Sequence, residues 1–361
     1  MLPVIHNYGD VLDRVDPREI RGVYKKIFSS LQRGKALEQF IYLDDAYLLA
    51  LDGTGYFSSK KVFCENCCKK EHKDGSTTYY HQMLSGVLVH PDKKAVIPIA
   101  PEPIIQQDGS KKNDCERNAA VRFLEDFRRE HPHLKVIVTE DGLSSNAPHI
   151  NLLKDLDLGF ILGCKPGDHK SLFDFVNASE EGEDVLHLKM TQNKIQHAFR
   201  WMNQVPLNDA NPSMLVNFLE YWETKGDKTT HWSWVTHLTL TADNVFQVMK
   251  AGRARWAIEN ETFNTLKNSD YNFEHNFGHG NKNLSVVLAL LMMLAFLIDQ
   301  VQQIACQLFQ KAKKRLGTNR ELWEVMRSFL KNFRFSGWEE FLSAMAYGIK
   351  TEFQIEFESS A

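Results

Sequence analysis

Two short apolar runs that lead into acidic residues constrain the fold of this chain more than any other feature. The first, Tyr42–Asp52 (YLDDAYLLALD), ends in Asp52, and the second, Lys135–Thr139 (KVIVT), is followed by Glu140 and Asp141. The second run has the β-branched composition of a strand that is buried on both faces. Sheets flanked by helices place their functional groups at strand ends. We therefore expect Asp52 and Asp141 to share a site, and Glu140 to face solvent.

Strand-like and helical patterns alternate around these runs and predict an α/β fold with a mixed sheet flanked by helices. The first three strands are expected to form an antiparallel meander. Gly53-Thr54-Gly55 is expected to form a turn after the first strand. In a sheet of this connectivity the first and fourth strands lie side by side, so their terminal aspartates meet. The predicted strands are Tyr42–Asp52, Tyr79–His90, Ala95–Ile99, Lys135–Thr139 and Gly159–Cys164, and the predicted helices between them are Asn113–Glu130 and Ser145–Leu156.

A later helical stretch supplies a third acid between two bases. In Ala251–Lys267 (AGRARWAIENETFNTLK), Arg255, Glu259 and Lys267 project along one side of the helix. The alternative interpretation is a solvated amphipathic helix with surface salt bridges. Three carboxylates in one place repel one another unless cations bind, and their oxygens suit two Mg²⁺ or Mn²⁺ ions. Such a pair of ions catalyses displacement at a phosphodiester.

The sequence pattern divides the chain into five segments. Asp16-Pro17 is a helix start in the N-terminal segment, and Thr241 or Asp243 can cap the helix that carries Glu259. Three further helices are predicted at Asn283–Leu316, Arg320–Phe333 and Trp338–Ile349. The segments are an N-terminal helical segment (1–41), the first part of the α/β core (42–164), a separate β-rich insertion lobe (165–240), the core helix with Glu259 (241–270) and a C-terminal helical region (271–361).

Composition is typical of a soluble globular protein, with 43% apolar and 25% charged residues. The net charge of -3 gives no whole-chain case for binding nucleic acid. However, Lys311–Arg334 carries eight Lys or Arg against two Glu, so Lys313 and Lys314 can either contact a phosphate backbone or keep a helical bundle soluble. The apolar run Val286–Ile298 is too short to cross a bilayer and fits a buried core helix. With no signal peptide, we expect a cytoplasmic protein without membrane contact.

The six cysteines are expected to be reduced thiols, because the chain is large and has no secretory leader. Cys64-x-x-Cys67-Cys68 followed by His72 has the spacing of a structural zinc knuckle. His81 or Cys115 is a candidate for a further ligand from outside the knuckle. The alternative is that none of these residues binds metal. His275-x-x-x-His279 is interpreted as a polar turn, because glycines interrupt it.

Three motifs carry a resemblance to a known family. LDGTGYFSS, TEDGLSSNAPH and R-W-x-I-E-N-x-x-F-N-x-L-K resemble the acidic motifs of bacterial insertion-sequence transposases with a ribonuclease-H-like DDE core. The closest group is the one whose last motif is tyrosine, arginine, glutamate, lysine. Gly252 stands at the tyrosine position, and Lys267 is one residue further from Glu259 than in the usual form. Glu261 is an alternative acid, although its spacing to Lys267 is one residue too short.

The resemblance implies a fold, an activity and a set of site residues. Asp52, Asp141 and Glu259 would bind the divalent ions, and Arg255 and Lys267 would contact DNA phosphates. The insertion that begins at Lys165 would clamp DNA. The protein would act as a homodimer on double-stranded DNA, comprising the ends of its own element and a target, in the cytoplasm and at the nucleoid of a bacterium.

We therefore expect a DNA transposase that hydrolyses the phosphodiester at element ends and joins the freed 3′-hydroxyl to target DNA. One alternative is a ribonuclease-H-like nuclease or resolvase that cuts without joining. Another is a catalytically silent DNA-binding remnant of a mobile element. Only about fifty residues precede Asp52, which is fewer than in most transposases of this kind. The resemblance is therefore also compatible with an N-terminally truncated copy of such a transposase.

Overall fold

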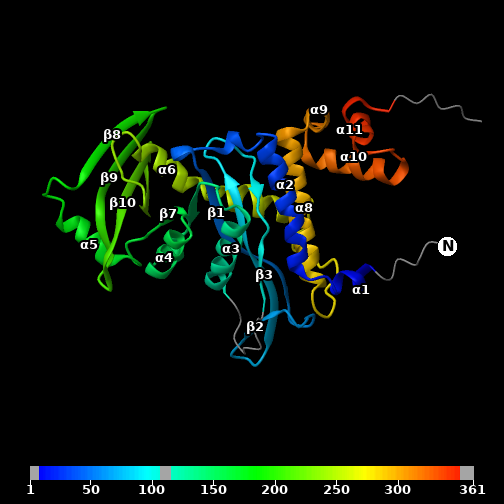
Figure 1. The fold of residues 1–361 in the computed structure, drawn as a ribbon, viewed down its shortest axis with the longest axis horizontal. Helices are drawn as coiled ribbons and strands as arrows, with labels where there is room; N and C mark the ends of the chain where they lie inside the picture. The colour runs from blue at the N-terminus through cyan, green and yellow to red at the C-terminus, as the bar shows by residue number, and fades with distance from the viewer. Residues whose placement is uncertain (1–7, 106–114, 350–361) are drawn as a thin grey trace, which may run out of the picture.

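The computed structural model describes residues 8–105 and 115–349 and contains one eleven-stranded mixed sheet (Figure 1). The strand order is β2-β3-β1-β6-β7-β11-β10-β9-β8, and β4 and β5 both pair with β3. The α/β class is confirmed. The strands are β1 Tyr47–Ser59, β2 Cys68–Glu71, β3 Thr77–Val89, β4 Ile97–Pro98, β5 Glu102–Ile104, β6 Val136–Glu140, β7 Gly159–Gly163, β8 Leu186–Gln192, β9 Ile195–Asn208, β10 Asn211–Lys225 and β11 Lys228–Thr236.

Helices cover the sheet and form the C-terminal end of the chain. Figure 1 shows α3 and α4 in front of the sheet and α9, α10 and α11 as a group beyond α8. The α-helices are α1 Tyr8–Asp13, α2 Pro17–Arg33, α3 Glu116–Glu130, α4 Ala147–Asp155, α5 Lys170–Ala178, α6 Val245–Ala254, α7 Asn264–Asn268, α8 Leu284–Ala305, α9 Gln307–Leu316, α10 Asn319–Asn332 and α11 Trp338–Tyr347. A π-helical segment, η5, spans Ile258–Phe263 between α6 and α7, and short 3₁₀ turns lie at η2 Glu38–Phe40, η3 Leu43–Asp45 and η4 Gly142–Ser144.

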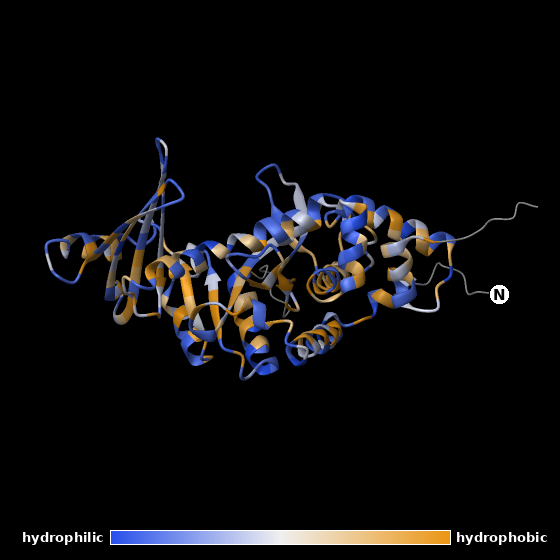
Figure 2. Cartoon of the chain, turned by 90° about the horizontal axis from the view of Figure 1, so that it is seen from above, coloured by the Kyte–Doolittle hydropathy of each residue, from blue (hydrophilic) through white to orange (hydrophobic). Residues whose placement is uncertain are grey.

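The central strand β1 is parallel to β6 and antiparallel to β3. Its residues 48–51 are all buried, because neighbouring strands and helices cover both faces. The predicted adjacency of the first and fourth strands is therefore confirmed. Figure 2 shows apolar residues on these inner strands and hydrophilic residues at the tips of the projecting hairpins.

The predicted turn at Gly53-Thr54-Gly55 is wrong, because these residues continue β1. Gly53 pairs with Leu84 and Thr54 with Met83, and the register shifts only between Gly55 and Phe57. The partner strand β3 is long enough to pair with β1 throughout this stretch, so the glycines sit within a ladder. The strand also begins later than predicted, because Leu43–Asp45 forms a 3₁₀ turn.

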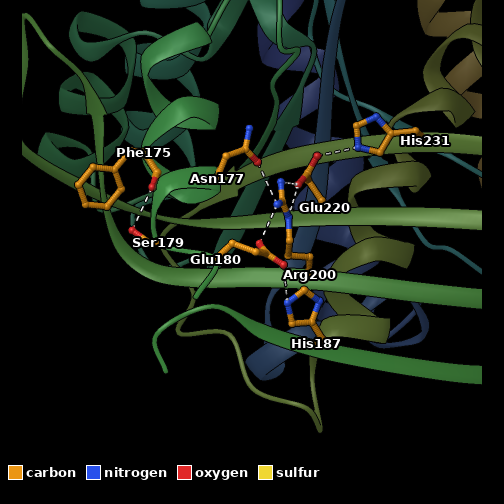
Figure 3. Close-up of polar contacts among 8 residues, drawn as sticks. All are labelled: Phe175, Asn177, Ser179, Glu180, His187, Arg200, Glu220 and His231. Atoms are coloured by element: carbon orange, nitrogen blue, oxygen red, sulfur yellow. Dashed lines mark hydrogen bonds and ion pairs between the residues drawn. The ribbon is translucent and has the colours of Figure 1, made fainter. Parts of the chain in front are cut away.

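The insertion is β-rich, as predicted, but its strands continue the core sheet. Trp234 of β11 pairs with Gly163 of β7, which joins the two halves edge to edge. Figure 3 shows how α5 is held over the outer strands. Arg200 of β9 forms an ion pair with buried Glu220 of β10, and its Nη1 donates to Glu180 Oε2 at 2.9 Å, just beyond the helix. The expectation of a separate lobe is corrected accordingly.

The predicted helix 243–267 and the predicted helix Asn283–Leu316 are each broken. In the first, η5 interrupts the α-helical pattern, and Asn244 rather than Thr241 or Asp243 occupies the N-cap. The second breaks at Cys306, whose sulfur accepts a hydrogen bond from the Phe309 N–H at 3.5 Å. The Asn113 start predicted for α3 lies outside the described residues.

Helix α8 is apolar over most of its length and belongs to the protein core. By length and composition alone it could span a membrane, but more than half of its most apolar window is buried inside the protein. Tyr24 of α2 donates a hydrogen bond to the Leu290 carbonyl at 2.8 Å, and the Val96 N–H donates to Gln300 Oε1 at 3.2 Å. The prediction of a buried core helix is therefore confirmed in position, although the helix is longer than the run from which it was predicted.

Candidate functional site

Asp52 lies within β1, and Asp141 directly follows the end of the adjacent parallel strand β6. Pairing between β1 and β6 ends with Ala50 opposite Thr139, and each aspartate follows two residues after that last pair. Both carboxylates line one open cleft of about 740 Å³, together with Glu116 at the start of α3. The two acids that the sequence analysis paired are therefore brought to the same edge of the sheet.

Arg255 connects Asp52 to Glu259. Its Nη1 lies 3.3 Å from Asp52 Oδ2, and its Nη2 lies 2.7 Å from Glu259 Oε1. The Arg255 side chain is 13% exposed, whereas that of Glu259 is 50% exposed. The guanidinium thus stands between an acid of the sheet and an acid of the helix, and it offsets part of the charge of each.

The site raises the pKa of Asp52 to about 6. Burial is the main cause, the Arg255 charge opposes it, and the negative charges of Glu259 and Asp141 add to it. The Gly53 N–H donates to Asp52 Oδ1 at 2.9 Å and favours the ionised form. A bound cation stabilises ionised carboxylates most where negative charges are close together and partly buried.

Glu116 is a further carboxylate of the cleft that Asp52 and Asp141 line, and the sequence analysis did not single it out. A Cβ added to Gly53 would lie 2.1 Å from Glu116 Oε1, so the glycine is what allows the carboxylate to approach β1. Burial raises the pKa of Glu116, and the Asp141 charge raises it further. Glu116 could be assigned to this cleft only from the structure, because 63 positions separate it from Gly53 in the sequence.

Asp141 also fills an ordinary structural role. Its Oδ1 accepts a hydrogen bond from the Leu143 N–H at 3.0 Å and caps the turn η4. One carboxylate oxygen of Asp141 is therefore engaged in capping this turn. The remaining oxygen lone pairs stay available to the cleft.

Glu140 is buried, so the expectation that it faces solvent is wrong. It is 5% exposed and contacts His149 Nε2 of α4 at 2.5 Å. Burial acts against a charged imidazole, but the Glu140 charge and this hydrogen bond together raise the pKa of His149. The pair ties α4 to the end of β6, beside Asp141.

Glu259 and its alternative, Glu261, have different surroundings in the structure. Glu259 contacts Arg255, whereas Glu261 lines a different hollow together with His90 and Lys93. Gly252, which stands where the family motif has tyrosine, packs against Trp234, and a Cβ there would lie 2.5 Å from the indole Nε1. The Trp234 indole of β11 therefore occupies the space that a side chain at position 252 would need.

Two of the three predicted DNA-contacting lysines contact residues other than the three acids. Lys267 forms an ion pair with Glu274 at 2.9 Å. Lys313 donates to Gln303 Oε1 at 2.7 Å and is half-buried, and Lys314 is exposed on the same helix, α9. Helix α9 belongs to a second small apolar core built by Phe309 and other residues of α9, α10 and α11.

A buried cluster that can bind a metal such as zinc lies elsewhere in the structure. It consists of Cys64, Cys67, His81 and His279, whose ligand atoms all lie within 4.8 Å of one another. Within 8–105 and 115–349, no other group of three or more acidic, cysteine or histidine side chains is gathered this closely. Asp52, Asp141 and Glu259 are therefore more loosely arranged than this cluster.

The predicted zinc ligands are corrected in part. Cys68 lies outside the cluster, because its sulfur donates to the Ile104 carbonyl at 3.5 Å. His72 is also outside it, with Nε2 2.8 Å from Thr78 Oγ1. Of the two outside candidates, His81 joins the cluster and Cys115, exposed at the start of α3, does not. His279 was interpreted as part of a polar turn and is a member of the cluster.

No family model matches this chain, and no curated protein matches it.

Proposed function

We propose that this protein is a DNA transposase with a ribonuclease-H-like catalytic core. The observation that carries the proposal is that Asp52, within β1, and Asp141, directly after the adjacent parallel strand β6, line one cleft. Arg255 then links Asp52 to Glu259. The three motifs that resemble the transposase family supply these three acids in the same order. Chance placement of two acids near one cleft does not account for a third acid, Glu259, that is joined to Asp52 through Arg255.

The donor set fits divalent ions. Asp52, Asp141 and Glu259 would hold two Mg²⁺ or Mn²⁺ ions, because their carboxylate oxygens are the ligands these ions prefer. Bound ions supply activation of a water or 3′-hydroxyl and stabilisation of the leaving oxygen. The raised pKa of Asp52, caused mainly by burial and in smaller part by the charges of Glu259 and Asp141, is consistent with the proposal, since a bound cation would favour the ionised carboxylate.

The chain's own groups hold the charges and the substrate. Arg255 offsets two carboxylates and presents a guanidinium that can bind a phosphate with two hydrogen bonds. The cleft of about 740 Å³ is in the size range of ligand sites in proteins. Lys267, Lys313 and Lys314 contact the DNA backbone further out, and strands β8–β11 clamp the duplex.

The partners follow from the same proposal. The substrates are double-stranded DNA at the element ends and at the target, and two protomers hold two ends. The protein therefore works in the bacterial cytoplasm, at the nucleoid.

One observation favours a second candidate, a catalytically silent DNA-binding remnant. Arg255 occupies the space between Asp52 and Glu259, and the three acids are not gathered within ligand distance of a common point. An arginine that stayed there would compete with a cation for the same carboxylates.

Magnesium-dependent cleavage and joining of the DNA that flanks the gene tests the proposal. Asp52→Ala, Asp141→Ala and Glu259→Ala are each expected to lower cleavage by a factor on the order of 10³ or more, because residues that act as one unit fail together. Glu261→Ala is the matched control on the same helix and is expected to cleave normally. Circular dichroism and a DNA-binding assay check that the fold and DNA binding are intact.

Each other outcome has a defined meaning. Full cleavage by any of the three variants removes that acid from the site. Cleavage by the wild type without strand transfer supports a nuclease or resolvase. DNA binding with no cleavage by the wild type supports the silent remnant.

A further inference from the structure

The cluster of Cys64, Cys67, His81 and His279 joins three distant parts of the chain. The two cysteines lie in the loop between β1 and β2, His81 lies on β3, and His279 lies in the loop that precedes α8. All four side chains are buried. None of them takes part in the acidic cleft.

Four of the distances within the cluster match those of one tetrahedral metal ion, and all of its ligand atoms lie within 4.8 Å of one another. The two sulfurs are 3.8 Å apart, His81 Nε2 is 3.3 Å from each sulfur, and His279 Nε2 is 3.4 Å from Cys67 Sγ. Bonds of about 2.3 Å to sulfur and 2.0–2.1 Å to nitrogen place tetrahedral ligands about 3.8 Å apart for two sulfurs and about 3.6 Å apart for sulfur and nitrogen. The observed distances agree within about 0.3 Å.

Two alternatives that need no metal fit less well. A disulfide requires a sulfur separation of about 2.05 Å, far shorter than 3.8 Å. Thiol–imidazole hydrogen bonds are weak, and Nδ1 of both His81 and His279 is buried without a hydrogen-bond partner in the described structure. Tyr56 stacks on the His81 ring and Phe57 packs against the His279 ring. Coordination through both Nε2 atoms would offset the cost of burying these polar rings.

We propose that these four residues bind one structural Zn²⁺ ion. Two thiolates and two imidazoles form a closed Cys₂His₂ set with no position left for water or substrate, as in structural rather than catalytic zinc sites. Sulfur and nitrogen ligands without carboxylates select zinc over magnesium or calcium. The inference goes beyond the transposase proposal and does not depend on it.

The ion would fasten the loop before α8 to the hairpin that carries Asp52. Backbone contacts already join the two segments, because the Glu65 N–H donates to the Asn281 carbonyl at 2.9 Å. On the other side of that loop, Asp13 Oδ1 accepts from the Asn283 and Leu284 N–H groups at 2.8 Å and caps α8. Zinc at this junction would hold α8 and the β1–β3 hairpin in one fixed arrangement.

Metal analysis of the full chain, purified without added metal or chelator, tests the proposal. We expect about one zinc per chain in the wild type and less than a fifth of that in Cys64→Ser and His279→Asn. Cys68→Ser and His72→Asn are the matched controls, because they change a neighbouring cysteine and histidine outside the cluster. Both are expected to keep their zinc.

A second measurement uses the unmutated protein, in case the ligand variants fail to fold. Exchange of zinc for Co²⁺ is expected to give intense visible bands of a tetrahedral ion and a thiolate charge-transfer band. Wild-type protein without zinc that also gives no such bands would overturn the proposal. Retention of zinc by Cys64→Ser and His279→Asn, or a Cys64–Cys67 disulfide found by mass spectrometry, would overturn it as well.

Discussion

Arg255 sets the charge balance at the candidate site. It is the cation that contacts both Asp52 and Glu259, and without it two partly desolvated carboxylates would face each other. Spacing in the sequence predicted that Arg255 and Glu259 share a helix face. That the same guanidinium reaches Asp52, 203 positions away, depends on how the helix packs against the sheet.

Individual residues differed in how well the sequence predicted them. Asp52 and Asp141 could be predicted because each follows a short apolar run, although only Asp141 lies at a strand end and Asp52 lies within β1. Glu116 and His279 could not, because each becomes part of a cluster only through contacts with distant segments. Cys68 was overpredicted, since spacing alone does not tell which of two adjacent thiols points into a site.

His131 makes the fold sensitive to acid. Burial, together with the smaller effect of the charges of Lys25, Arg21 and Arg128, lowers the pKa of His131 to about 4. Between about pH 6.5 and pH 4 the folded state binds fewer protons than the unfolded state, so the free energy of unfolding decreases as the pH falls through this window. We expect a loss of about 3 kcal/mol from this group, since one pKa unit corresponds to about 1.4 kcal/mol.

Urea denaturation at several pH values measures that loss. His131→Gln removes the titrating ring, so its stability should fall less steeply between pH 6.5 and pH 4 than that of the wild type. Packing lost in the variant shifts its stability equally at all pH values and leaves the slope interpretable. An unchanged slope would show that His131 is not responsible.

The sequence patterns predicted whether a segment is a helix or a strand better than they predicted where that helix or strand begins and ends. The antiparallel meander and the buried strand β6 follow from alternation and β-branched composition. The turn expected at Gly53-Thr54-Gly55 did not form, because a long partner strand outweighs the local preference of glycine. The break at Cys306 and the segment η5 interrupt helices without any proline or glycine to indicate them.

A pair of helical glycines tests whether α6 packs on the sheet as described. Gly252→Ala places a methyl group 2.5 Å from Trp234 Nε1 and is expected to destabilise the protein by about 1–3 kcal/mol. Gly22→Ala in α2 meets nothing within 4 Å and is expected to stabilise it by roughly 0.5–1 kcal/mol. Urea denaturation compares the two variants, and equal effects would contradict the close contact between α6 and β11.

The whole molecule is organised by one sheet that carries both the acidic cleft and the insertion strands. The sequence predicted a β-rich insertion but not that β11 would pair with β7, because strand pairing at long range leaves no periodic signal in either strand. The acidic cleft and the cysteine–histidine cluster lie on the same central hairpin, formed by β1 and β3. Two metal sites with different ligands are therefore proposed in one protein. One has oxygen ligands, and the other has sulfur and nitrogen ligands.

The central claim is that Asp52, Asp141 and Glu259 bind divalent ions. Binding of Mn²⁺ to zinc-loaded protein, measured by electron paramagnetic resonance, tests this claim most directly. The wild type is expected to bind up to two Mn²⁺ per chain. Asp52→Asn combined with Asp141→Asn is expected to weaken this binding by at least roughly 10–100-fold, and Glu261→Gln is expected to leave it unchanged. Equal Mn²⁺ binding by the double variant and the wild type would contradict the account.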